Sequence, residues 1–217
     1  MDMVSMMWEG ILETLYMTLV SSVLAYAIGI PLGVILVVTD SDGIRPCRPV
    51  HDVLGFFVNI FRSIPFIILL FLMLPLTLLL VGTQIGSIAI IPPLTVSAAP
   101  YVGRMVESAL KEVDSGVVEA AKSMGASTWQ IIWKVLLPEA RPSLLVGAAI
   151  VMTTILGYTA MAGMCGGGGL GAIAANYGYY RWQADIMIIA TVLLVVIVQI
   201  IQEIWMRASK ASDKRIR

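Results

Sequence analysis

The chain has 217 residues, of which 59% are hydrophobic and 13% are charged, and its formal net charge at pH 7 is zero. A soluble domain carries about 25% charged residues, so this composition excludes an ordinary soluble fold. The balanced charge also gives no basic field that would attract nucleic acid. Several stretches lack charge over the roughly 20 residues that a helix needs to cross a bilayer. The sequence therefore predicts an all-α, multi-pass membrane protein with one domain.

Five apolar segments are expected to span the membrane as helices. They cover residues 11–38, 53–81, 87–110, 143–162 and 185–206. No Lys or Arg precedes the first segment, so it is read as a permanent span and not as a cleaved signal peptide. The second segment contains Pro65 and Pro75 and is unusually long, and we expect its first part to lie near the membrane interface.

Basic residues in the connecting segments predict the orientation of the chain. The connections on one side, together with the C-terminal tail, carry eleven Lys and Arg residues, whereas those on the other side carry only Arg181. Because basic loops stay in the cytoplasm, we expect an external N-terminus and a cytoplasmic C-terminus. Loop 111–142 is then cytoplasmic. Cys47 and Cys165 fall on opposite sides and cannot pair.

Loop 111–142 carries strong local signals for two short helices. Asp114 or Ser115 can cap a first helix that ends near Ser123, and Gly125 permits a left-handed turn after it. Ser127 then begins a second helix, with a capping-box partner three residues later.

The second helix of the loop is expected to stop at its prolines and to carry one large apolar face. Pro138 and Pro142 lie just before the fourth span and should end the helix there. The expected face consists of Trp129, Ile132, Trp133 and Leu136, and the first helix has a smaller one of Val117, Val118 and Ala121. Such a helix pair suits docking on a soluble partner, or else it lies on lipid headgroups.

The spacing of residues in this loop resembles the EAA motif of ABC-importer permeases. The motif has the form E-A-A, three residues, G, and then an apolar–Leu–Pro close. Here the chain has Glu119, Ala120, Ala121 and Gly125, and ten residues separate Gly125 from Leu136, which precedes Leu137 and Pro138. The resemblance implies that loop 111–142 contains the coupling helices, which sit in a cleft of a separate ATP-binding subunit.

The rest of the chain also resembles this family. The stretches NIFRSIPFIILL at 59–70 and LTVSAAPYVGRMVESAL at 94–110 are similar to those of permeases in methionine ABC importers. The resemblance implies a type I importer permease fold and a homodimer in the bacterial inner membrane. It also implies two ATPase subunits, an external substrate-binding protein and methionine as substrate, whereas composition and periodicity do not specify a substrate.

Polar positions in the fourth span are candidates for the transport route. Thr154 and Tyr158 could line the route and Met161 could form an outer gate, although Ser and Thr in membranes often only join helices. Arg104 and Glu107 are three residues apart and can pair at the cytoplasmic end of the third span.

Enzymatic and metal-binding readings find little support in the sequence. A GxGxxG pattern occurs at 166–171, but it follows a membrane span and not a strand, so we expect a flexible external loop. His51 has no ligand partners at metal-binding spacing, and no metal site is expected. The chain has no GxxxxGK[ST] loop, so ATP and Mg²⁺ are expected on the partner ATPase, with no cofactor on this chain.

Three other readings stay open beside a methionine permease. A permease for another amino acid would share the same motif. A membrane scaffold or assembly subunit would use the loop to bind a partner without ATP-driven flux. An enzyme embedded in the membrane would need catalytic polar groups within its spans, where only Arg62, Arg104 and Glu107 are available.

Overall fold

The computed structural model of the protein describes residues 2–213, all of whose regular elements are helices. In chain order these are α1 (Met3–Thr39), α2 (Arg48–Ser63), α3 (Phe66–Val81), α4 (Ser87–Lys111), α5 (Ser115–Ser123), α6 (Thr128–Ile131), the π-helix η1 (Ile132–Leu136), α7 (Leu137–Glu139), α8 (Arg141–Gly163), α9 (Gly169–Ile173), the π-helix η2 (Ala174–Tyr179) and α10 (Ala184–Ser212).

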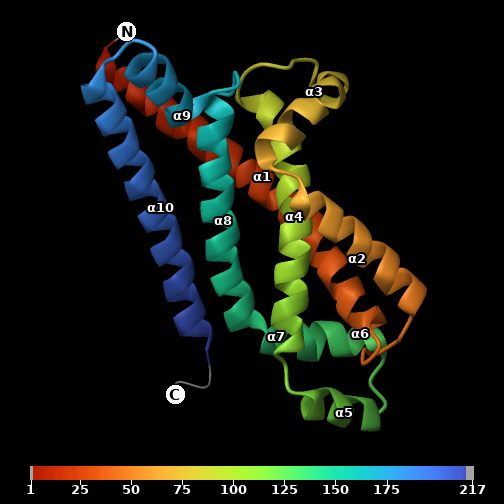
Figure 1. The fold of residues 1–217 in the computed structure, drawn as a ribbon. Coiled ribbons are helices and arrows are strands. Elements are labelled where there is room, and N and C mark those ends of the chain that lie inside the picture. Colours follow the sequence, from red (N-terminus) through yellow and green to blue (C-terminus); the bar gives the residue numbers. More distant parts are fainter. Residues whose placement is uncertain (1, 214–217) are drawn as a thin grey trace.

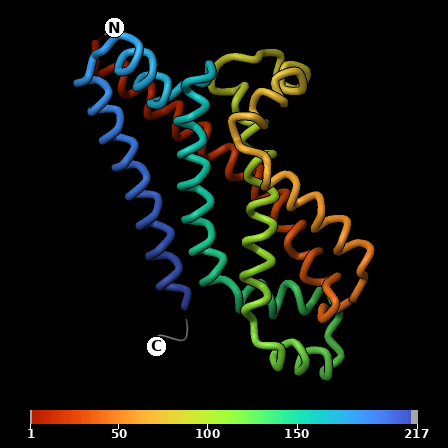
Figure 2. Tube along the Cα trace, viewed as in Figure 1, coloured from red at the N-terminus to blue at the C-terminus, as the bar shows by residue number. Residues whose placement is uncertain are grey.

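The long helices form a bundle that α1 crosses obliquely (Figure 1). Helices α8 and α10 run side by side, and α1 passes behind α8 and α4 to reach α2 (Figure 2). The short helices α5 to α7 lie at one end of the bundle, close to the end of α10. Helix α1 begins at the opposite end, beside α9. The exposed 111–142 loop and the start of the chain are therefore at opposite ends of the molecule.

Within residues 2–213, three helices are long and apolar enough to cross a membrane, namely α1, α8 and α10. The pair α2 and α3 meets the same test if it counts as one span, but its two helices meet at 105°. Helix α4, which matches the predicted third span, carries three prolines and is not among them. The five-span count therefore stays a prediction.

The predicted span 53–81 is not one continuous helix, because the chain breaks at Ile64 and Pro65. Ile64 has an extended backbone with φ −79° and ψ 121°, and Pro65 precedes the first residue of α3. A proline disfavours helical dihedrals in the residue before it, which explains the break. In contrast, α1 continues through Pro31.

Small residues allow α1 and α4 to pack closely. A Cβ atom added to Gly29 would lie 2.5 Å from Cβ of Val102, and one added to Gly33 would lie 2.5 Å from the carbonyl oxygen of Gly103. Ala25 on the same helix is fully buried. The core of the molecule lies at this contact and extends into the 111–142 loop.

Candidate functional site

The first helix of the 111–142 loop has a well-defined beginning and end. The Asp114 carboxylate accepts a hydrogen bond of 2.7 Å from the Gly116 N–H, as predicted for a capping residue. At the other end Gly125 has φ +78°. The Ala126 N–H donates to the Ala121 carbonyl and the Gly125 N–H donates to the Lys122 carbonyl, which is the Schellman arrangement.

The second helix begins with the predicted capping box. The Ser127 hydroxyl accepts from the Gln130 N–H at 3.3 Å, and the Gln130 side chain accepts from the Ser127 N–H at 2.8 Å. The predicted stop near Pro138 and Pro142 is found between them, because the chain stays helical through Pro138 to Glu139 and breaks at Ala140. The residues before Pro138 form the π-helix η1, whose turns are wider than those of an α-helix. Pro138 therefore follows a π-helical turn and not an α-helical one.

The predicted large apolar face of this helix is divided in the structure. Ile132 and Leu136 are buried in the core, together with Ile131. Trp129 and Trp133 instead remain 67% and 54% exposed and contact each other edge to face, with ring centroids 5.4 Å apart. The two tryptophans thus form an outward aromatic pair on the loop.

The residues of the EAA-like motif have two different environments. Ala121 is only 4% exposed and belongs to the same core as Ile131 and Leu136, so it holds the two short helices together. Glu119 and Ala120 are exposed. Glu119 also lines a cavity of about 440 Å³ between α5 and the end of α1. The exposed surface of α5 therefore includes Glu119 and Ala120.

The remaining motif residues are also at the surface of the loop. Gly125 and Pro138 are exposed and Leu137 is half-buried. A Cβ atom on Gly125 would meet nothing within 4 Å. Within this chain, glycine is therefore needed for its positive φ and not for lack of space.

A cluster of ion pairs joins the base of the loop, at the end of α4, to the end of α1. Arg104 pairs with Glu107 at 2.5 Å, which confirms the predicted contact. Glu107 also contacts Lys111 at 2.9 Å, and the Lys111 ammonium reaches Asp40 at 2.6 Å. The hydrogen bond from Lys111 is the main reason that the pKa of the Asp40 carboxyl lies below its usual range.

His51 lies beside this cluster, an arrangement that the sequence did not reveal. Ligand atoms of Asp40, His51 and Glu107 all lie within 4.8 Å of one another. The residues come from the end of α1, from α2 and from α4, so their spacing in sequence gives no signal. Because the Lys111 ammonium binds both carboxylates, the cluster is already charge-compensated by a side chain.

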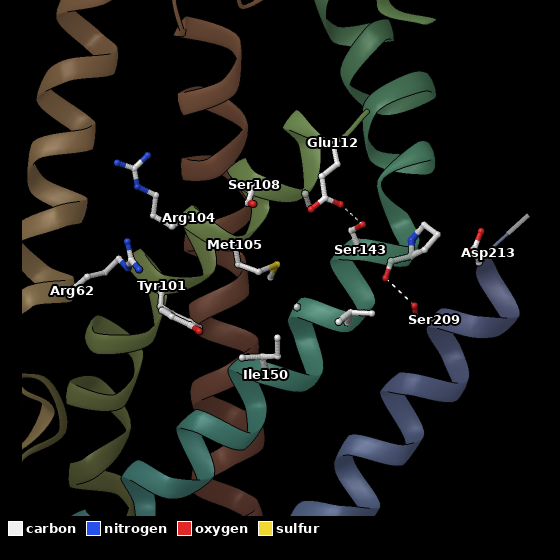
Figure 3. A pocket seen from close by; sticks show the side chains of 14 residues that line it. Arg62, Tyr101, Arg104, Met105, Ser108, Glu112, Ser143, Ile150, Ser209 and Asp213 are labelled. Atoms are coloured by element: carbon white, nitrogen blue, oxygen red, sulfur yellow. Dashed lines mark hydrogen bonds between the residues drawn. The ribbon is translucent and has the colours of Figure 1, made fainter. Parts of the chain in front are cut away.

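Two cavities lie along α4 and α8. The first, here called the loop-end cleft, has a volume of about 570 Å³ and is lined by residues such as Glu112, Ser143 and Ser209 (Figure 3). The second, called the inner cavity, has about 180 Å³ and is lined by Thr154 and Tyr158 among others.

Only two of the three residues predicted to line the transport route lie in the same cavity. Thr154 and Tyr158 share the inner cavity, and the Tyr158 ring stacks on Phe66 with centroids 4.5 Å apart. Met161 is 43% exposed and does not line this cavity. The structure adds Arg62 and Tyr101 to the cavity lining.

The glycine run at 166–171 is packed against α1 and is not a loose loop. The Glu13 carboxylate accepts a hydrogen bond of 2.5 Å from the Gly169 N–H, and the Thr14 hydroxyl accepts one of 2.9 Å from the Leu170 N–H. A Cβ atom on Gly168 would collide with the side chains of Glu13 and Ser87. Sequence reasoning missed Glu13 because its partner lies 156 residues away.

The structure thus combines apolar helices long enough to span a membrane, an exposed loop at one end, and cavities along α4 and α8, which are features of a membrane-embedded protein. The chain belongs to the family described as the inner membrane component of binding-protein-dependent transport systems, which matches residues 29–212. This membership places the chain in the inner membrane and agrees with a non-catalytic membrane subunit.

Curated relatives cover nearly the whole chain. A probable D-methionine transport system permease from Vibrio cholerae is 51% identical over 203 residues, which are 94% of this chain and 90% of the relative. A methionine import system permease from Bacillus subtilis is 47% identical over 209 residues, which are 96% of this chain and 94% of the relative.

Solved structures give the same result for the fold. A chain of the MetNI methionine ABC transporter, in an inward-facing conformation, is 47% identical and superposes with a TM-score of 0.97 over 99% of this chain and 100% of its own length. The type I permease fold implied by the EAA-like motif is thus confirmed. An amino acid ABC transporter at 19% identity and a TM-score of 0.77 covers 97% of this chain and 99% of its own length, and it supports the fold alone.

Proposed function

We infer that this chain is the permease subunit of a methionine ABC importer. The observation that carries this conclusion is the similarity along the full length to proteins named for methionine transport, at 51% identity for one relative and a TM-score of 0.97 for one structure. The similarity to this relative spans 94% of the chain, so it is not confined to the 111–142 loop.

We further propose how the subunit is assembled. Two copies form a homodimer in the lipid bilayer, with the N-terminus external and the C-terminus cytoplasmic. Each 111–142 loop docks on one ATPase subunit through Glu119, Ala120 and Gly125, and ATP and Mg²⁺ bind only to that partner. An external binding protein delivers the amino acid. The exposed and internally braced α5 supports this role for the loop.

Transport then follows from two arrangements of the same helices. ATP closes the ATPase subunits, the docked loops move together, and the helices tilt so that the cavities along α4 and α8 open outward. Hydrolysis returns them to the inward arrangement. The permease performs no covalent chemistry, and the nucleotide acts by shifting the population between two packed states.

Uptake into proteoliposomes tests this proposal. The vesicles contain the chain, its ATPase and its binding protein, and uptake of labelled methionine is compared with that of histidine, glutamine and arginine. We expect selective, ATP-dependent uptake of methionine. A non-hydrolysable ATP analogue serves as the control and should abolish uptake.

Each alternative result has a distinct meaning. Uptake of another amino acid would retain the transporter and overturn the substrate. Absence of uptake for all four amino acids, with the complex intact, would contradict transport and favour a scaffold role.

A further inference from the structure

Two side chains stand between the loop-end cleft and the inner cavity. The two cavities share Arg62 and Tyr101 and no other lining residue of the described chain. Along α8, the cleft is lined by residues 142–150 and the inner cavity by residues 151–158. Arg62 and Tyr101 therefore lie where the two cavities adjoin.

The contact between these side chains is of a kind that opens easily. The Arg62 guanidinium carbon lies 5.7 Å from the centroid of the Tyr101 ring, within the range of a cation–π contact (Figure 3). Such a contact is worth about 0.5–1 kcal/mol at an exposed site. Arg62 is also in the last turn of α2, directly before the break at Ile64, and it is exposed.

Arg62 differs from the other arginine that lines the cleft. Arg104 is neutralised by Glu107 and also donates a hydrogen bond of 3.2 Å to the Asn59 side chain. Among residues 2–213, no carboxylate lies within salt-bridge distance of Arg62. Its guanidinium is therefore available to an anion that enters from either cavity.

We propose that Arg62 and Tyr101 form a carboxylate-binding gate on the transport route. The guanidinium binds the carboxylate of the passing amino acid, leaves the Tyr101 ring, and so connects the two cavities. A planar guanidinium suits this task because it binds a carboxylate through two parallel hydrogen bonds. This inference rests on the proposed transport function and on the assignment of the two cavities to its route.

Chemical modification of an engineered cysteine at Thr154 tests the gate. Cys47 and Cys165 are first replaced by Ser, and the assembled complex with its ATPase is studied without nucleotide. Thr154→Cys in the inner cavity is then treated with size-matched anionic and cationic methanethiosulfonates. Each reaction rate is divided by the rate of the same reagent with a free thiol. We expect this normalised rate to be several-fold higher for the anionic reagent than for the cationic one.

The variants separate the roles of the two gate residues. Arg62→Gln should reduce the ratio of anionic to cationic rates to about one, and Tyr101→Ala should raise both rates without changing the ratio. Arg48→Gln is the matched control, because Arg48 begins the same helix, is exposed and lines neither cavity. It should leave both rates unchanged.

Protection by ligands tests carboxylate binding directly. Methionine should protect the cysteine from the cationic reagent, and Arg62→Gln should raise the concentration needed by at least tenfold. Methioninol, which lacks the carboxylate, should protect only at high concentration in both proteins. If Arg62→Gln fails to assemble, Arg62→Lys is used, and it should keep the reagent preference but still weaken protection by methionine.

The possible failures are distinguishable. If the charge preference and the protection by methionine are the same in both proteins, the gate is overturned while the transport route stands. If the cysteine reacts with neither reagent in an intact complex, the assignment of the inner cavity to the route is overturned together with the gate. The uptake experiment on the unmodified chain would still decide the transport function.

Discussion

The pair of Asp40 and Lys111 connects the end of α1 to the base of the 111–142 loop. Lys111 is shared between two carboxylates, at 2.6 Å from Asp40 and 2.9 Å from Glu107. The cluster thereby ties together α1 and α4 at the point where movement of the loop would enter the bundle. Its individual contacts are partly exposed, so each contributes little alone.

Replacing Asp40 with Asn should lower the stability of the purified complex by roughly 0.2–1 kcal/mol at pH 7. The folded-state pKa of Asp40 is lowered, so its contribution is present above the usual Asp value of 3.8 and is lost as the pH falls through the folded pKa. Thermal unfolding at pH 7, 5 and 3.5 should show a constant difference between the two proteins at the first two values and a smaller one at the third.

Asp42→Asn is the matched control for this measurement. Asp42 lies in the same connection, is exposed, and among residues 2–213 has no hydrogen bond or ion pair. An equal loss of stability in both variants would show that the partner Lys111 does not matter. A difference that persists unchanged at pH 3.5 would contradict ionisation of Asp40 as its cause.

At the scale of elements, the close contact of α1 and α4 is the main packing feature. Gly33→Leu should lower the unfolding temperature, because its added atoms would meet the Gly103 carbonyl and the side chain of Val106. Overpacking of this kind typically costs about 1–3 kcal/mol. Fluorescence-detected size-exclusion chromatography after heating measures the shift. Ala27→Leu on the exposed side of α1 is the control, and equal midpoints for both variants would refute the packing argument.

The sequence predicts elements well where their hydrogen bonds are local. The capping box of Ser127 and the turn at Gly125 each join residues at most five positions apart, so their residue types carry the information. The outward direction of Trp129 and Trp133 could not be read in this way. The core contacts the side of this helix that carries Ile131, Ile132 and Leu136, and tertiary packing decides which side that is.

Contacts between segments that are distant in the chain also could not be predicted from the sequence. Glu13 caps the start of α9 from 156 residues away, and the Asp40–Lys111–Glu107 cluster draws on two helices. Arg62 was noted as a polar residue near a span, but its place between two cavities depends on the bend at Ile64. Such contacts arise from tertiary packing, which the periodicity of apolar residues in the sequence does not reveal.

At the scale of the whole molecule, the two ends of the bundle are held together by different contacts. One end has α9 fastened to the start of α1, and the other carries α5 to α7 on a core that continues from α4 (Figure 1). The 111–142 loop is thus part of the rigid bundle and not a tether. A force applied to α5 would reach α4 and α8, which line both cavities.

Because the loop is rigid, the backbone at Gly125 decides how α5 and α6 are placed relative to each other. Gly125 has φ +78°, a conformation that costs an ordinary residue roughly 1–2 kcal/mol and is worst for a β-branched side chain. Gly125→Val should turn the two short helices away from each other and remove most of the ATPase that copurifies with the chain. Gly125→Asn should retain more of it than Gly125→Val, because Asn tolerates the left-handed region and a Cβ atom meets no atom of this chain within 4 Å. Both variants should reach the membrane in equal amounts.

If Gly125→Val copurifies as much ATPase as the parent protein, α5 is not the docking element. The exposed pair of Trp129 and Trp133 is then the next candidate for the docking surface.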